Sequence, residues 1–327
     1  MSAPVATPEA PPGLPAIPAG AHAGDRLFHG VTTAVAVAVL VVLLVMTAFL
    51  LTRAWPAVRT AGFDFLTERE WFPDAVPARF GIAALVWGTV LTSVLALAVA
   101  VPVALGSALY VTEYAPPAVG RWIGYLVDVL AAVPSVVYGL WGLLFLVPRM
   151  VPLQQFLADH LGFIPFFHNP DDIFGKSVFA VSVVLALMVL PIVAAVSREV
   201  FRQVPNDLRE AALALGATRW EMVRTAVLPP SRSGVIGAVI LGLGRALGET
   251  IAVALVLAAT FDVNLRILRP GGNTIAANIA TKFGEAGAMG RSALIASGLV
   301  LFAITLAATV AARGVIRRTA RAVTGRP

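Results

Sequence analysis

Two charged residues of opposite sign stand four positions apart within a long apolar stretch of the sequence. Arg245 and Glu249 lie between Ser233 and Phe261, and on a continuous helix residues four positions apart share a face. An ionised side chain near the middle of a bilayer costs roughly 2.5–3.5 kcal/mol. We therefore expect this face to line a bundle interior or a wet cavity, where intramembrane charges are usually functional.

The chemistry that this pair suits is the binding of an oxyanion. A guanidinium offers a planar fork of donors that matches phosphate bidentately, and it stays protonated in any environment. We expect Glu249 to hold the fork of Arg245 in place and to limit how tightly the anion is retained, with Thr250 as a further hydroxyl donor. The alternative is an internal ion pair without function, beside a packing seam of small residues at Gly244 and Gly248.

A third charge, Asp128, stands shortly before a second segment of interest. This segment begins at Pro134, and a proline removes a hydrogen bond from the helix. In transporters such breaks place freed backbone groups on a cavity. We expect Ser135 and Tyr138 to donate hydrogen bonds to the same anion. It stays open whether Asp128 is an interfacial acid and Tyr138 an interfacial aromatic residue.

A polar loop between two apolar stretches predicts a first short helix over 208–215. Asp207 followed by Glu210 is typical of a capping box at its start. Gly216 suits the left-handed residue that ends a helix. Because Ala211 and Ala212 leave this helix slim, we expect it to fit a groove on a partner protein.

The same loop predicts a second short helix. Thr218 with Glu221 is a second capping box, and Pro229-Pro230 should stop the helix that it opens. Capping and turning, as in any connector between membrane spans, is the plainer interpretation of both helices.

The elements that must position these residues are membrane helices. No alternating pattern favours a barrel, and six stretches are long and apolar enough to cross the hydrocarbon core: Val31–Leu51, Phe80–Thr112, Trp122–Val147, Ser177–Ser197, Ser233–Phe261 and Ser292–Ala312. The sequence therefore predicts an all-α membrane protein with six transmembrane helices.

Composition supports this fold class. Only 13% of the 327 residues are charged and 58% are hydrophobic, whereas soluble domains carry about 25% charged residues. This excludes a soluble enzyme and a disordered scaffold. The chain has no cysteine, which excludes disulfides, thiolate metal sites and cysteine nucleophiles.

Arginine distribution predicts the orientation. The stretch 198–232 carries six Arg, and 313–327 carries five with no acid, so both should be cytoplasmic. Residues 1–30 are rich in Pro and Ala and should form a disordered cytoplasmic tail. We expect 31–82 to hold a retained first helix and an extracytoplasmic segment.

The loop residues resemble the coupling loop of the permease subunits of ABC importers. The matching positions are Glu210, Ala211, Ala212, Gly216, Ala226, Leu228 and Pro229, with Ala226 where a larger aliphatic residue is usual. The resemblance implies that Glu210–Gly216 docks into the cleft of a cytoplasmic ATPase. The chain itself has no Gly-x-x-x-x-Gly-Lys-Ser/Thr phosphate loop.

Two membrane segments narrow the resemblance. Residues 133–142 and 243–253 are similar to the PstC-type permease of the high-affinity phosphate importer, an ABC transmembrane type-1 protein. The likeness covers about residues 60–315. It implies a type I importer permease core over 83–313, a basic tail over 314–327, and a part for Arg245 and Glu249 in phosphate passage.

The resemblance also implies partners and a location. These are a PstA-type permease, a dimer of PstB-type ATPases and a PstS-type phosphate-binding protein, working by alternating access in a bacterial inner membrane. Both termini would be cytoplasmic, and the subunit would be non-catalytic, with no metal or cofactor. Four alternatives stay open: a permease for molybdate or sulfate, the PstA-type partner permease, an intramembrane enzyme such as a lipid phosphatase, and a passive anion channel.

Overall fold

A computed structural model describes residues 20–324 of the chain, and its side chains over 24–314. The chain divides into two units, 1–52 and 53–327, and each is described by itself. The first unit contains most of helix α1, Gly20–Ala61. Residues 1–19 of the tail predicted to be disordered lie outside the described residues. Residues 20–30 are helical, so the predicted start of the first helix at Val31 is too late.

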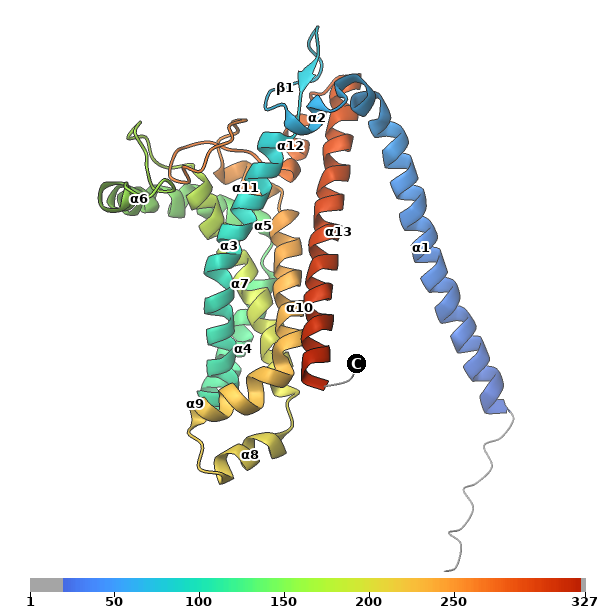
Figure 1. The fold of residues 1–327 in the computed structure, drawn as a ribbon, viewed down its shortest axis with the longest axis vertical. Helices are drawn as coiled ribbons and strands as arrows, with labels where there is room; N and C mark the ends of the chain where they lie inside the picture. Colours follow the sequence, from blue (N-terminus) through green and yellow to red (C-terminus); the bar gives the residue numbers. More distant parts are fainter. Residues whose placement is uncertain (1–19, 325–327) are drawn as a thin grey trace, which may run out of the picture. The chain divides into compact units, whose positions relative to one another are not determined.

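The second unit consists of helices and one antiparallel hairpin (Figure 1). Its elements are α2 (Asp64–Thr67), β1 (Trp71–Phe72), β2 (Arg79–Phe80), α3 (Ala83–Leu109), π-helical η1 (Tyr110–Tyr114), α4 (Pro117–Ala132), α5 (Ser135–Trp141), π-helical η2 (Gly142–Leu146), α6 (Val147–Leu161), α7 (Val178–Arg202), α8 (Asn206–Ala214), α9 (Arg219–Met222), π-helical η3 (Val223–Val227), α10 (Leu228–Leu247), α11 (Ile251–Val256), α12 (Ile275–Lys282) and α13 (Ala288–Thr324).

Helix α7 is the centre of the packing. It contacts α3, α4 and α10. Of the 18 residues in its most apolar stretch 67% are buried, against 28% for the corresponding stretch of α3 with η1. The α3 side of this contact is a row of fully buried alanines, Ala96, Ala100 and Ala104, whose spacing lets two helix backbones approach closely. Ser177 begins α7 by accepting a hydrogen bond from the Ala180 amide.

The hairpin caps one end of this unit and is held to it by side chains. Trp71 stacks on Phe261, with ring centroids 6.3 Å apart. The carboxylate of Asp74 accepts hydrogen bonds of 2.9 Å from the amides of Gly287 and Gly290, which satisfies backbone donors at the start of α13. Helices α8 and α9 lie at the opposite end (Figure 1).

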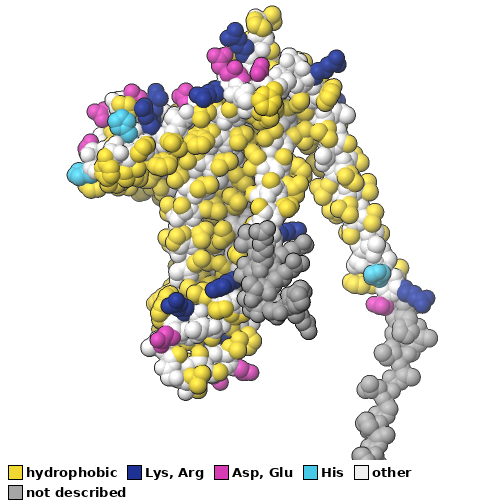
Figure 2. Space-filling view, viewed as in Figure 1, with side chains coloured by type: hydrophobic (Ala, Val, Ile, Leu, Met, Phe, Trp, Pro, Cys, Tyr) yellow, Lys and Arg dark blue, Asp and Glu magenta, His cyan; other side chains and the backbone are white. Residues whose placement is uncertain are grey.

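The described residues contain six helices long and apolar enough to cross a membrane, which confirms the predicted number. Hydrophobic side chains cover the flanks of the second unit, while charged side chains gather toward its two ends (Figure 2). This distribution is typical of a membrane-spanning bundle.

The bounds of two predicted spans are wrong. Trp122–Val147 is broken at Val133, which is extended because it precedes Pro134, and the apolar helix there is Ser135–Leu161. The fifth apolar helix is Arg219–Leu247, so Ser233–Phe261 is not one span. Pro229-Pro230 lies in the first turn of α10, following η3, and does not stop the helix.

Packing in the second unit extends beyond the predicted permease core of 83–313, whose limits stay a prediction. This unit begins at Arg53, because the hairpin and the end of α1 pack on α13. The Ser292 hydroxyl donates to the Arg53 carbonyl at 2.8 Å and accepts from the Ala57 amide at 3.0 Å. The predicted basic tail 314–327 continues α13 as helix to Thr324.

Candidate functional site

Two interrupted helices meet in the second unit, and they carry the two membrane segments that the sequence singles out. Helix α4 is followed, after Val133–Pro134, by α5, and α10 is followed, after Gly248–Thr250, by α11. Helices α5 and α11 pack together. Gly139 permits this contact, because a Cβ atom there would lie 2.7 Å from the Cα atom of Ala252.

Arg245 lies in the last turn of α10 and is half-buried. The free carbonyls of a helix C-terminus favour a cation. Its Nε atom is buried and has no hydrogen-bond partner among the described residues. The side chain lines a pocket of about 490 Å³ together with Ile192 of α7, Gly244 of α10 and Thr309 of α13. A positive charge therefore lies on the lining of a pocket with mainly apolar walls, and one of its donors is buried without a partner among the described residues.

Glu249 is buried, with 7% of its surface exposed. Its Oε1 atom accepts a hydrogen bond of 3.2 Å from the Ala252 amide in the first turn of α11. The prediction that Arg245 and Glu249 share the face of a continuous helix is wrong, since α10 ends at Leu247. Over the part of the chain with described side chains, no salt bridge joins them. Gly248 is the signal that the sequence offered for this end.

The other predicted hydroxyl donors, Thr250, Tyr138 and Ser135, differ in whether their hydroxyl groups already bind the protein. The Thr250 hydroxyl donates to the Gly248 carbonyl at 3.0 Å, so its proton is already used within the break. The Tyr138 hydroxyl donates to the Leu130 carbonyl at 2.9 Å, and this hydrogen bond spans the break between α4 and α5. Ser135 begins α5 and is half-buried.

Asp128 has a partner that the sequence did not predict. Its Oδ1 atom lies 2.8 Å from Nη2 of Arg198 on α7, and the Asp128 side chain is 53% exposed. No described contact brings Asp128 to Arg245. Arg198 is the first basic residue after the predicted fourth span, and this position is the signal that could have suggested an interfacial partner for a nearby acid.

The predicted coupling loop contains both of its short helices. Helix α8 covers 206–214, and Gly216 has a φ of +82°, the left-handed conformation that glycine adopts without strain. The capping box of Thr218 and Glu221 is present at α9. The first capping box is wrong, because α8 begins at Asn206 after Pro205 and has no side-chain cap.

The predicted docking residues of α8 lie on its surface. Glu210 and Ala211 are exposed, and Ala212 packs half-buried on an apolar cluster beneath the helix. Leu213 and Leu215 are also exposed, at 44% and 89%. An apolar helix face with a carboxylate beside it is therefore available to a partner.

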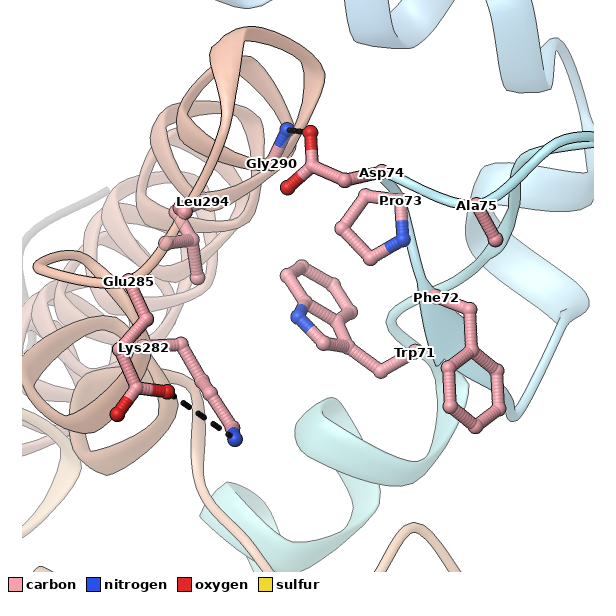
Figure 3. Close-up of a pocket in the computed structure, with 10 residues that line it drawn as sticks. Trp71, Phe72, Pro73, Asp74, Ala75, Lys282, Glu285, Gly290 and Leu294 are labelled. Atoms are coloured by element: carbon pink, nitrogen blue, oxygen red, sulfur yellow. Dashed lines mark hydrogen bonds and ion pairs between the residues drawn. The ribbon is translucent and has the colours of Figure 1, made fainter.

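A second pocket, of about 290 Å³, lies between the hairpin and the α12–α13 turn (Figure 3). Its charged groups are already engaged: Asp74 accepts from two amides, and Lys282 Nζ lies 4.0 Å from a Glu285 carboxylate oxygen. This pocket therefore has fewer unpaired donors for an anion than the Arg245 pocket, over the described residues. Over the described residues, no group of three or more His, Cys, Asp or Glu is placed to hold a metal ion.

Comparison with known proteins gives consistent matches. A family model for the binding-protein-dependent transport system inner membrane component matches residues 100–321. The phosphate transport system permease protein PstC 2 of Mycobacterium tuberculosis is 42% identical over 299 residues, which cover 90% of this chain and 92% of that protein. The PstC permease of Xylella fastidiosa is 41% identical over 302 residues, covering 91% and 92%.

Solved structures resemble the fold. A bacterial ABC transporter involved in the import of the acidic polysaccharide alginate aligns with a TM-score of 0.57 and 18% sequence identity. The alignment covers 90% of this chain and 99% of that chain. At this identity the likeness concerns the fold alone.

Proposed function

The chain belongs to the binding-protein-dependent transport system inner membrane components, and within them to the PstC permeases, and from this premise we propose that Arg245 binds phosphate in its translocation path. The protein is a multi-pass membrane permease with the six-helix fold of ABC importers. It is the permease of a phosphate importer, as its relatives are named.

The observation that carries the proposed site is the state of the Arg245 guanidinium. Its Nε atom is buried and lacks a partner among the described residues, and the side chain lines a pocket of about 490 Å³. A phosphate that enters this pocket meets a half-buried guanidinium, so a charge-assisted hydrogen bond costs less desolvation than one to a fully exposed cation. Glu249, buried two residues beyond the end of α10, limits how tightly the anion is held.

Orientation and partners follow from the two ends of the second unit. The end with α8 and α9 carries the Arg-rich loop, and we assign it to the cytoplasm together with both termini. There α8 docks on a PstB-type ATPase dimer through Glu210 and its apolar face. The hairpin end faces outward toward a PstS-type binding protein, and a PstA-type permease completes the path beside Arg245. ATP is hydrolysed by the ATPase, and this subunit is non-catalytic.

Reconstitution tests the assignment. The complex of this chain with its PstA-, PstB- and PstS-type partners is placed in proteoliposomes, and uptake of radiolabelled phosphate is followed with and without ATP. We expect ATP-dependent uptake that excess sulfate and molybdate leave unchanged. Uptake of sulfate or molybdate that excess phosphate does not reduce would contradict the substrate.

A further inference from the structure

Arg209 of α8 makes a two-pronged contact with Glu113 of η1. The Arg209 Nε atom lies 3.1 Å from Oε2 of Glu113, and Nη2 lies 3.0 Å from Oε1. The two side chains are 15% and 3% exposed. This fork geometry fixes orientation as well as distance, and it does so in a place largely closed to water.

The same guanidinium also holds the end of α7. Nη2 donates to the Phe201 carbonyl at 2.7 Å, and Nη1 donates to the Val204 carbonyl. Carbonyls at a helix C-terminus have no partner within the helix, so a donor from outside satisfies them. One side chain therefore ties three elements together: α8, the α7 end and the η1 extension of α3.

The surroundings of this joint are apolar and tightly packed. Phe201 and Val204 of the α7 end lie in a buried cluster with Met222, Val223 and Val227 of the α9–η3 segment. Buried ion pairs add little net stability compared with apolar packing, and their best-attested use is to fix one arrangement of elements. Helix α8 lies beyond the lower end of α3 (Figure 1), so an ion pair between the two elements can fix how α8 is placed against the bundle.

Helix α7 links the joint to the proposed phosphate pocket. Its C-terminal carbonyls bind Arg209, and its Ile192 lines the pocket of Arg245. Helix α7 also has its largest contact with α3, which continues into η1 and Glu113. A displacement of α8 that preserves the Arg209 contacts must therefore carry α7 and α3 with it.

We propose that Arg209 and Glu113 form the joint that transmits movement of the ATPase-docked helix α8 to α3 and α7, and so to the pocket. Arg209 is a positioning residue and touches no substrate. The inference rests on the proposed function, since it presumes an ATPase partner at α8.

Coupling stoichiometry tests the joint. In proteoliposomes of the full complex, phosphate taken up per ATP hydrolysed is compared for wild type, Arg209→Lys, Glu113→Gln and the control Arg202→Gln. Lysine keeps the charge but not the fork. We expect Arg209→Lys and Glu113→Gln to retain the ATPase and hydrolyse ATP, while phosphate taken up per ATP hydrolysed falls below the ratio of wild type and of Arg202→Gln.

The control and the contrary result separate this joint from a merely structural contact. Arg202 is exposed at the end of α7, so its loss should leave the ratio unchanged. A wild-type ratio in the Arg209 and Glu113 variants, or an equal fall in uptake and hydrolysis, overturns the joint. If wild type itself takes up no phosphate, the proposed function fails and the joint with it.

If the Arg209 and Glu113 variants fail to fold, a measurement that leaves both residues unchanged still tests the joint. The chain has no cysteine, so spin labels on this chain attach only where cysteine is introduced, at Val103 on α3 and Asp207 on α8, both exposed. We expect one label-to-label distance in the nucleotide-free and ATP-bound complex. A distance that changes between the two states shows that α8 moves independently of α3, and the proposal is then wrong.

Discussion

Arg245 keeps a positive charge at the end of α10 for reasons that belong to the residue itself. A guanidinium does not deprotonate in proteins, and the carbonyls at the helix C-terminus favour a cation. Its residue type and its apolar surroundings in the sequence predict a charge that faces a cavity, and Arg245 does line a pocket, while its part in transport stays a prediction. The hydrogen-bond partners of Glu249 and Thr250 were not predictable, because the spacing suggests a continuous helix. In the structure both side chains bind backbone groups at the break between α10 and α11.

At Glu249, charge and capping can be separated. Glu249→Gln keeps an oxygen that accepts from the Ala252 amide but removes the negative charge two residues beyond the end of α10. We expect unfolding free energy within about 1 kcal/mol of wild type, together with tighter phosphate retention and slower uptake. Thermal unfolding and initial uptake rates measure the two effects.

Glu249→Ala is the matched control, because it also removes the cap and should cost about 1 kcal/mol of stability. Uptake by Glu249→Gln at the wild-type rate would mean that the carboxylate serves α11 and has no part in releasing the anion.

At the scale of elements, the two helix breaks differ in how well they could be foreseen. Pro134 predicts its own break, since proline constrains itself and the residue before it. The break at Gly248–Thr250 depends on tertiary packing of α11 against α5 through Gly139 and Ala252, and one glycine in a helical pattern does not decide it. The π-helical η3 is likewise invisible to helical periodicity, which is why Pro229-Pro230 was misread as a stop.

Gly216 sets the turn between α8 and α9. Gly216→Pro cannot adopt the observed φ of +82°, because proline fixes φ near −65°. We expect the α8 docking surface to be displaced. The PstB-type ATPase then either fails to co-purify or hydrolyses ATP without phosphate transport. Pull-down and ATPase assays check this. Gly106→Ala, at an open helical position of α3, is the control, and retained binding with coupled hydrolysis in Gly216→Pro would contradict the docking role of α8.

Asp74 fastens the hairpin to α13 (Figure 3). Asp74→Ala leaves the amides of Gly287 and Gly290 without their acceptor, and the loss of such a cap costs about 0.5–2 kcal/mol. We expect a lower unfolding midpoint with the Arg245 pocket intact. Differential scanning fluorimetry in detergent measures it, and an unchanged midpoint would show that the tie adds no stability.

At the scale of the whole molecule, composition and hydropathy predicted the fold class and the six apolar helices. They did not predict unit boundaries, because contacts of α13 with the hairpin and with residues 53–57 join segments far apart in the sequence. The link from α8 to the membrane helices was also missed. Arg209 and Glu113 are 96 positions apart, and no local pattern pairs them.

The whole importer should need its ATPase. Proteoliposomes that contain the permeases and the binding protein but lack the PstB-type subunit should take up no phosphate above the level of empty vesicles, because α8 then has no partner to move it. Radiolabelled uptake with and without that subunit checks this. Phosphate flux that persists without it would identify a passive anion channel.

The most direct test of the account replaces Arg245 by glutamine in the reconstituted complex. Glutamine is polar but uncharged, so phosphate loses its charge-assisted fork. With Arg313→Gln as the control at an exposed position of α13, we predict that Arg245→Gln assembles with its partners and abolishes ATP-dependent phosphate uptake. Uptake at the wild-type rate by the assembled Arg245→Gln complex would contradict the central claim.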